Sequence, residues 1–208
     1  MPQIEAVIFD LGNVLIGWHP EAYYDSTIGP DRRREMFAEV DLHSMNDRVD
    51  LGENFTETIY KAADENPKWR AEIREWHDNW IKLLTPVITH SVTLLRALRA
   101  KGVPVFSLTN FGAETHAYAV TQYPFLGEFD RQYISGHLKM IKPDPRIFAR
   151  VEEDCGLLPG HLLFTDDRAD NIAEARKRGW NTHLFEGPQG WADRLVAEGL
   201  LDAQEAAA

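Results

Sequence analysis

The chain has 208 residues, of which 44% are hydrophobic and 26% are charged, and its formal net charge is −11. This composition is typical of a folded protein with a sizeable core and argues against a disordered or fibrous chain. The negative charge repels polyanions, so we expect no nucleic acid partner.

The first apolar stretch runs from Ala6 to Phe9 and predicts a strand buried on both faces, as in a parallel sheet covered by helices. Residues 20–84 then lack any strand signal. Helical patterns cover 31–40, 54–64 and 67–84, the last with Trp69, Ile73, Trp76 and Trp80 at helical spacing. We interpret residues 20–84 as a helical insertion and its tryptophans as core packing residues.

Strand and helix patterns alternate from about residue 91 onward. Strands are predicted over 103–108, 132–135 (a weaker signal), 161–165 and 181–185. Helices are predicted over 91–100, 145–155, 169–178 and 191–200. The alternation implies right-handed crossovers and a doubly wound α/β fold with a parallel sheet. The predicted domains are an α/β core of residues 1–19 and 85–208 and a small α-helical cap of residues 20–84.

The single cysteine, Cys155, cannot form an internal disulfide, and the sequence has no zinc-type Cys/His cluster. No basic segment followed by an apolar stretch marks a secretory signal, and no apolar run approaches the ~20 residues needed to span a bilayer. We therefore expect a cytoplasmic protein without a membrane partner.

Polar residues follow four of the predicted strands, at the edge where ligands collect in an open α/β sheet. They are Asp10, Thr109-Asn110, Asp166-Asp167 and, in the loop after the weaker strand, Lys142. Each also has a structural explanation, because Thr, Asn and Asp cap helices and lysines are commonly solvated.

The combination of these residues is harder to explain by capping. Two like charges ~5 Å apart repel by about 3 kcal/mol at an effective dielectric near 20, so gathering Asp10, Asp166 and Asp167 requires cations. Lys142 supplies one, and all-oxygen ligands favour Mg²⁺ as the second. A carboxylate in such a site can attack the phosphorus of a small anionic substrate and carry an aspartyl-phosphate.

Four stretches occur in an order that resembles the haloacid dehalogenase-like (HAD) hydrolase superfamily over nearly the whole chain. They are VIFDLGNVL with Asp10, VFSLTN ending at Asn110, MIKPDPRIF with Lys142, and LLFTDDRADNIAEA with Asp166, Asp167 and Asn171. The resemblance implies a Rossmann-like core, and the helical insertion resembles the small helical cap of one subfamily. The Asp-Asp-x-x-x-Asn form of the last motif, together with FDLGNV, is most similar to sugar-phosphate phosphatases of the glucose-1-phosphate phosphatase type.

The resemblance implies that Asp10 is the nucleophile and a Mg²⁺ ligand. Thr109 and Asn110 would bind the phosphoryl oxygens, and Lys142 would bridge nucleophile and phosphate. By the same resemblance Asp10, Thr109 and Lys142 form the catalytic set of a Mg²⁺-dependent phosphatase.

The resemblance also implies the remaining metal ligands. Asp167 would bind the ion, and Asp166 would either bind it directly or hold a residue that does. Gly12 would offer its backbone carbonyl to the metal, and Asn171 would orient the two acids by hydrogen bonding.

One position departs from the family pattern. Most phosphatases of the superfamily have a second aspartate two positions after the nucleophile, which protonates the leaving oxygen and later activates water, whereas this chain has Gly12. General acid–base catalysis is worth ~10² to 10⁴ in rate. The glycine therefore predicts a slow phosphatase, a substrate with a good leaving group, or a substitute acid such as His19 or His43.

Two alternatives stay open. In a 2-haloacid dehalogenase Asp10 would attack carbon, and an arginine of 32–34 could cradle the halide or carboxylate. That branch characteristically has Ser-Ser-Asn-x-x-Asp where this chain has DDRADN, and the extra acids oppose an anionic substrate. In a binding protein without turnover, the retained Asp10 and Lys142 would have no task.

Overall fold

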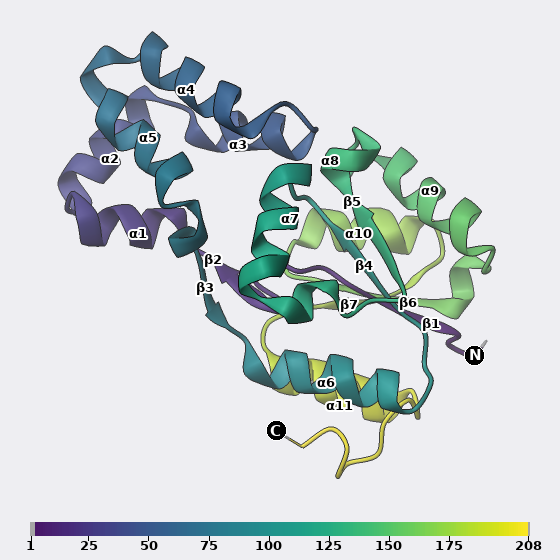
Figure 1. Ribbon diagram of the computed structural model, residues 1–208. Coiled ribbons are helices and arrows are strands. Elements are labelled where there is room, and N and C mark those ends of the chain that lie inside the picture. Colours follow the sequence, from purple (N-terminus) through teal and green to yellow (C-terminus); the bar gives the residue numbers. More distant parts are fainter. Residues whose placement is uncertain (1–2, 208) are drawn as a thin grey trace.

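Figure 1 shows a central sheet with helices on both faces and a separate group of helices at one end. This computed structural model describes residues 3–207, so residues 1–2 and 208 of the predicted core lie outside the described residues. Within the described part, no helix has both the length and the hydrophobicity that crossing a bilayer requires. The doubly wound α/β fold predicted from the sequence is confirmed.

Five parallel strands form the main sheet, in the order β5-β4-β1-β6-β7. They are β1 (Ala6–Phe9), β4 (Val105–Thr109), β5 (Arg131–Ile134), β6 (Leu162–Asp166) and β7 (Asn181–Leu184). The central strand pairs Val7 with Val105 on one side and Leu163 on the other. The chain leaves β1 toward β4 and later returns to its other side at β6, and the carboxyl ends of these strands border the crevice where such folds bind ligands.

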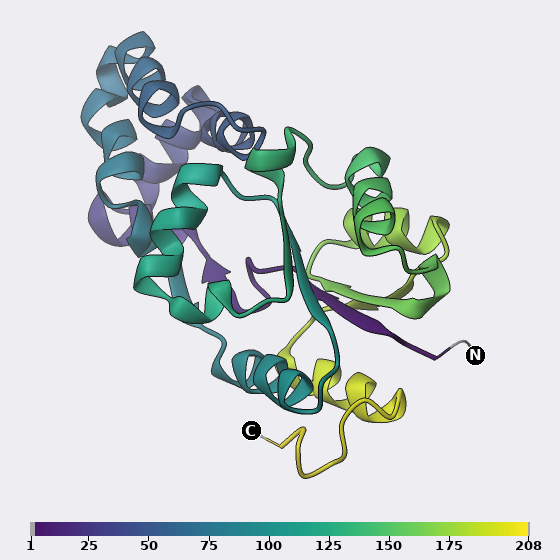
Figure 2. The same cartoon turned by 45° about the vertical axis from the view of Figure 1, so that its right-hand side comes forward.

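The helices beside the sheet bury its two faces separately. They are α6 (Thr89–Ala100), α7 (Ala113–Gln122), α9 (Pro145–Cys155), α10 (Ala169–Lys177) and α11 (Pro188–Ala197). Val7 and Phe9 share a core cluster with α6, α7 and α11, whereas Ala6 and Ile8 share one with α9 and α10. This is the period-two alternation of a strand buried on both sides. The turned view in Figure 2 places α6 and α11 together below the sheet.

The helical insertion lies apart from the main sheet (Figures 1 and 2). It consists of α1 (Pro20–Thr27), α2 (Pro30–Glu39), α3 (Leu42–Asp50), α4 (Phe55–Glu65), α5 (Arg70–Asp78) and the 3-10 turns η1 (Pro67–Trp69) and η2 (Trp80–Leu83). An antiparallel pair, β2 (Ile16–Trp18) and β3 (Leu84–Val87), connects it to the core. The remaining short elements are η3 (Pro124–Gly127), α8 (Ser135–Leu138) and η4 (Pro159–His161). The division at residues 20 and 84 into cap and core remains our proposal.

The helix predicted over 67–84 is broken, because α5 ends at Asp78 and the backbone of the next residue, Asn79, is not helical. The break turns the Trp80 ring toward Trp18 and Phe111. The centroid of the Trp80 ring lies 6.0 Å from that of Trp18 and 5.6 Å from that of Phe111. Trp69 and Trp76 are buried, as predicted for packing residues.

Helices α1, α3 and α7 have no counterpart in the sequence prediction. The inner face of α7 consists of Thr115, His116 and Ala119, which are polar or small, so its apolar pattern is weak. Tertiary packing, rather than a strong local pattern, holds this helix against the sheet.

Candidate active site

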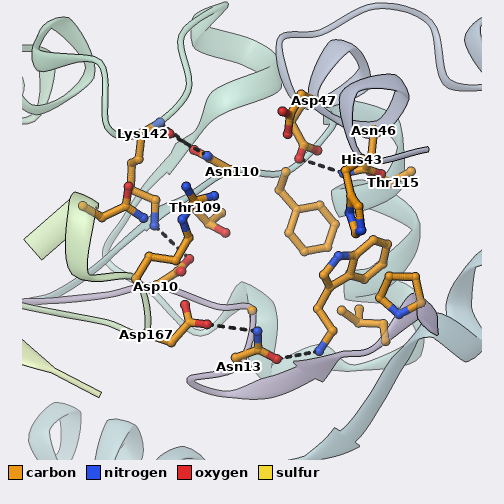
Figure 3. A pocket seen from close by; sticks show the side chains of 18 of the residues that line it. Asp10, Asn13, His43, Asn46, Asp47, Thr109, Asn110, Thr115, Lys142 and Asp167 are labelled. Carbon is orange, nitrogen blue, oxygen red and sulfur yellow. Dashed lines mark hydrogen bonds and ion pairs between the residues drawn. The ribbon is translucent and has the colours of Figure 1, made fainter. Parts of the chain in front are cut away.

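A cavity of about 450 Å³ lies between the carboxyl edge of the sheet and the helical insertion. Seven of the eight site residues predicted from the sequence line it, and Figure 3 shows several of them. They are Asp10, Gly12, Thr109, Asn110, Lys142, Asp167 and Asn171. The eighth, Asp166, does not line the cavity and is fully buried. The strand ends therefore converge as the sequence predicts.

Lys142 lies between two carboxylates. Its Nζ is 3.0 Å from Asp10 Oδ1 and 2.6 Å from Asp166 Oδ2, and it also donates to the Leu108 carbonyl at 2.8 Å. Burial alone would lower the pKa of Lys142, but the two carboxylates raise it above its ordinary value, so the side chain is charged. An ammonium group has three hydrogens, and here they face Asp10, Asp166 and the Leu108 carbonyl. An anionic ligand that binds Lys142 must therefore share one of these hydrogens with its present partner.

Asp10 is held through one of its two oxygens. Oδ1 accepts from the Leu11 amide at 2.7 Å and faces Lys142. Among residues 3–207, the hydrogen bonds of this carboxylate all end on Oδ1, which leaves Oδ2 without a protein donor. Burial, together with the charges of Asp166 and Asp167, raises the pKa of Asp10 from 3.8 to about 7 against the opposing charge of Lys142.

Asp166 is surrounded by donors. Asn171 Nδ2 lies 3.0 Å from both carboxylate oxygens, and the Arg168 amide donates to Oδ1 at 2.8 Å. Together with Lys142 these donors hold the carboxylate beneath the cavity. Asn171 thus contacts Asp166 but, within residues 3–207, makes no hydrogen bond to Asp167, and that it orients the two acids remains a prediction. The Asn171 Oδ1 is buried without a partner among the described residues.

Asp167 faces the cavity and is oriented by Asn13, a residue to which the sequence analysis assigns no role. Asn13 Nδ2 donates to Asp167 Oδ2 at 3.0 Å, and Asn13 Oδ1 accepts from the Trp18 amide at 2.9 Å (Figure 3). Asn13 has a φ of 55°, in the left-handed region where Asn is enriched among non-glycine residues. The sequence signal that could have identified Asn13 is its position in the motif VIFDLGNVL, directly after Gly12.

Asp10, Asp166 and Asp167 each offer an oxygen, and these oxygens lie within 4.8 Å of one another. Three carboxylates against the single ammonium of Lys142 leave an excess of two negative charges. Burial also raises the pKa of Asp167, which indicates that the charged forms lack compensation. An all-oxygen donor set with this excess charge fits a hard divalent cation such as Mg²⁺.

Gly12 lines the cavity without filling it. A Cβ built at this position would meet only the Trp18 Cβ, at 4.0 Å, and the Gly12 backbone is not among the left-handed glycines. The site therefore has room for a side chain here, so glycine is not required by space or backbone conformation. That its carbonyl binds a metal remains a prediction.

Thr109 is the last residue of β4, and Asn110 follows it beside Lys142. Thr109 is buried and lines the cavity. The Asn110 side chain is engaged with the Lys142 backbone, donating to its carbonyl at 3.0 Å and accepting from its amide at 2.7 Å. Asn110 therefore joins the two loops, and its predicted contact with phosphoryl oxygens remains a prediction.

The helical insertion forms the opposite wall of the cavity. It contributes Pro20, Glu21, His43, Asn46, Asp47, Asp50, Trp80 and Leu84. His43 Nε2 lies 2.9 Å from Glu21 Oε1, whereas His19, the other proposed substitute acid, does not line the cavity. Burial, reinforced by the charge of Asp47, raises the pKa of Asp50 from 3.8 to about 8.

The arginines at 32–34 lie on α2 and do not line the cavity. Arg33 pairs with Asp25 at 2.8 Å, and the other two pair with Glu72 and Asp31. The structure thus places none of them where a halide or carboxylate at Asp10 would bind.

A family model described as haloacid dehalogenase-like hydrolase matches residues 4–179. The D-ribitol-5-phosphate phosphatase of Bacteroides thetaiotaomicron is 23% identical over 214 residues, which cover 93% of this chain and 97% of that protein.

Solved structures share the fold. A HAD family enzyme of Bacteroides thetaiotaomicron, in complex with magnesium and inorganic phosphate, is 25% identical with a TM-score of 0.66, over 88% of this chain and 95% of that one. The L-2-haloacid dehalogenase of Xanthobacter autotrophicus is 18% identical with a TM-score of 0.61, over 98% of this chain and 87% of that one. The second likeness extends to the fold alone.

Proposed function

The chain belongs to the haloacid dehalogenase-like hydrolase family, and on that premise we propose that it is a Mg²⁺-dependent phosphatase of small phosphate monoesters of the sugar-phosphate type. The observation that carries this proposal is the cluster of Asp10, Asp166 and Asp167 around Lys142 at the wall of a cavity. The phosphatase relative and the neighbour holding magnesium and phosphate support the same reaction class.

In the proposed reaction Asp10 attacks phosphorus and the bond to the leaving oxygen breaks, which gives an aspartyl-phosphate and an alcohol once that oxygen is protonated. Water then cleaves the acyl phosphate and restores Asp10. Lys142 holds Asp10 by Oδ1, so Oδ2 is the oxygen free to react. Asp10, Asp167 and the Gly12 carbonyl would hold the Mg²⁺, which when bound neutralises charge on the transferring group.

Thr109 and the shared hydrogens of Lys142 would contact the phosphoryl oxygens. Asp166 and Asn171 would act through Lys142, since both are held beneath the cavity wall by mutual hydrogen bonds. Their role is to position the ammonium group of Lys142. A shift of Asp166 would move this group relative to Asp10.

Gly12 leaves the leaving oxygen without the usual proton donor at that position. We infer that the enzyme is slow on esters with poor leaving groups and relatively fast on those whose leaving oxygen is acidic. His43 is the cavity-lining candidate for a substitute donor, and His19 is not.

The dehalogenase alternative has less support. The cavity wall around Asp10 carries excess negative charge, which opposes a 2-haloacid, and the arginines at 32–34 are paired elsewhere. A binding protein without turnover would not need Asp10 to keep one oxygen free of protein donors.

The test is a panel of phosphate monoesters and 2-haloacids assayed with Mg²⁺ and with EDTA. We expect phosphate release that chelation abolishes. The Asp10→Asn variant should lose activity while keeping the native fold, which circular dichroism checks. Asp193→Asn, which makes the same substitution on the exposed surface of α11, should keep full activity.

Halide release in the presence of EDTA would replace the proposal by the dehalogenase alternative. Phosphate release by Asp10→Asn at most of the wild-type rate would show that another group is the nucleophile.

A further inference from the structure

Helix α3 presents a polar stripe to the cavity. The stripe, spaced at i, i+3, i+4 and i+7, consists of His43, Asn46, Asp47 and Asp50, all of which line the cavity. A neighbouring stripe of the same helix consists of the buried residues Leu42, Met45 and Val49. Residues at these spacings share one face of a helix. Figure 3 shows His43, Asn46 and Asp47 across the cavity from Asp10 and Asp167.

The carboxyl end of α3 is docked on the loop that follows Thr109 and Asn110. The Asp50 carbonyl accepts from Ser135 Oγ at 2.7 Å. A Cβ at Gly112 would lie 2.6 Å from Val49 Cγ1, so the two segments touch with no space for a side chain. The polar stripe is therefore held at a defined distance from the residues at the end of β4.

Charge is divided between the two walls of the cavity. Both lining residues with a full positive charge, Lys142 and Arg168, belong to the core side. The insertion contributes the carboxyl groups of Glu21, Asp47 and Asp50 and no lysine or arginine. Within residues 3–207, no hydrogen bond or ion pair ends on the carboxylate of Asp47, so its acceptors are available to a ligand.

From this arrangement we propose that the leaving group of the substrate is uncharged and polyhydroxylated, and that Asp47 selects it against leaving groups with a second anionic group. The inference rests on the proposed phosphatase function and names its substrate class. Carboxylate and amide oxygens on the α3 stripe accept hydrogen bonds from hydroxyl groups. A second carboxylate or phosphate would instead meet Asp47 without a cation on that wall.

The exposure of Asp47, which lies at the rim of the cavity, sets how strongly it can disfavour a leaving group with a second anionic group. For two like charges about 6 Å apart in a partly hydrated cleft, the repulsion corresponds to a factor of about ten in binding. Because solvent reaches Asp47, salt should reduce this factor.

The experiment compares kcat/KM for pairs of esters that differ only in one end group. Glycerol 3-phosphate is paired with 3-phosphoglycerate, and sorbitol 6-phosphate with 6-phosphogluconate. We expect the polyol of each pair to be preferred by about tenfold or more at low ionic strength. In Asp47→Asn the preference should fall by about tenfold, mainly through a lower KM for the carboxylate, and Asp47→Lys should favour the carboxylate.

Asp31→Asn is the matched control, because it removes the same charge from an exposed site in the insertion that does not line the cavity. It should leave the preference unchanged. An Asp47→Asn variant that slows both members of a pair equally would mean that Asp47 has a structural role, which overturns the inference.

Equal wild-type rates within both pairs would also overturn the inference while leaving the phosphatase function intact. If none of the four esters nor any other monoester releases phosphate, the proposed function itself fails.

Discussion

Replacing Lys142 by methionine removes the positive charge between Asp10 and Asp166 while keeping an unbranched side chain. In the metal-free protein the two carboxylates, whose oxygens lie 3.0 and 2.6 Å from the ammonium nitrogen, then have no compensating charge. Breaking a buried ion pair by removing one partner costs about 3–5 kcal/mol, because an unpaired charge stays in the interior. We expect the free energy of unfolding to fall by about this amount near pH 8.

The loss of stability in Lys142→Met depends on pH, because a carboxylate that takes up a proton no longer carries an uncompensated charge. Burial already raises the pKa of Asp10 from 3.8 to about 7, and losing the opposing charge of Lys142 raises it further. A carboxyl group with a raised folded-state pKa stabilises the fold below its unfolded pKa, and this stabilisation is lost as pH rises through the folded value. In the metal-free wild type the contribution of Asp10 to stability is therefore lost between about pH 4 and 7, and in Lys142→Met this loss continues to higher pH.

The assay is urea denaturation in EDTA at pH 5 and pH 8, followed by tryptophan fluorescence. The control is Lys177→Met on α10, where the lysine side chain is 77% exposed, and its stability should stay within about 0.5 kcal/mol of wild type. The reasoning is refuted if Lys142→Met is as stable as this control at pH 8, or if its deficit is the same at both pH values.

Two further predictions concern residues beside the acidic cluster. Asn13→Gly keeps the left-handed backbone but removes the amide that orients Asp167, so Mg²⁺ affinity measured by calorimetry should fall about 10-fold or more. Asn13→Ala should show the same affinity loss with an additional destabilisation of about 1 kcal/mol, whereas wild-type affinity in both variants would contradict the role of Asn13. Gly12→Asp, for which the structure has room, should raise kcat about 10-fold or more on alkyl phosphates and little on p-nitrophenyl phosphate. Gly12→Asn is its control, and equal rates for the two variants would argue against acid–base catalysis from this position.

Local pattern determined several elements of the core, although not α7. The helix predicted over 145–155 coincides with α9, because Asp144 caps its start, Pro145 suits the first turn and Gly156 ends it in a left-handed conformation. The predicted strand over 6–9 coincides with β1 for a similar reason, since its uninterrupted apolar run fits a strand buried on both faces.

Elements whose pattern depends on distant partners were missed. The pairing of β2 with β3 joins Ile16 to Val87 and Trp18 to Leu84, which are 71 and 66 positions apart. The break at Asn79 is explained by the contacts of Trp80 with Trp18 and Phe111. Neither partner is visible in the local sequence around the element, so local propensity could not predict them.

The sequence by itself determined which residues stand at the carboxyl ends of the strands, because an apolar run that stops at a polar residue is a local signal. Only the tertiary structure decided their arrangement. It places Asp167 on the cavity and Asp166 beneath it, it brings Asn13 to Asp167 across 154 positions, and it turns the α3 stripe toward Asp10. These relations depend on how the insertion packs against the sheet edge, and packing between segments far apart in the chain leaves no periodic trace in either segment alone.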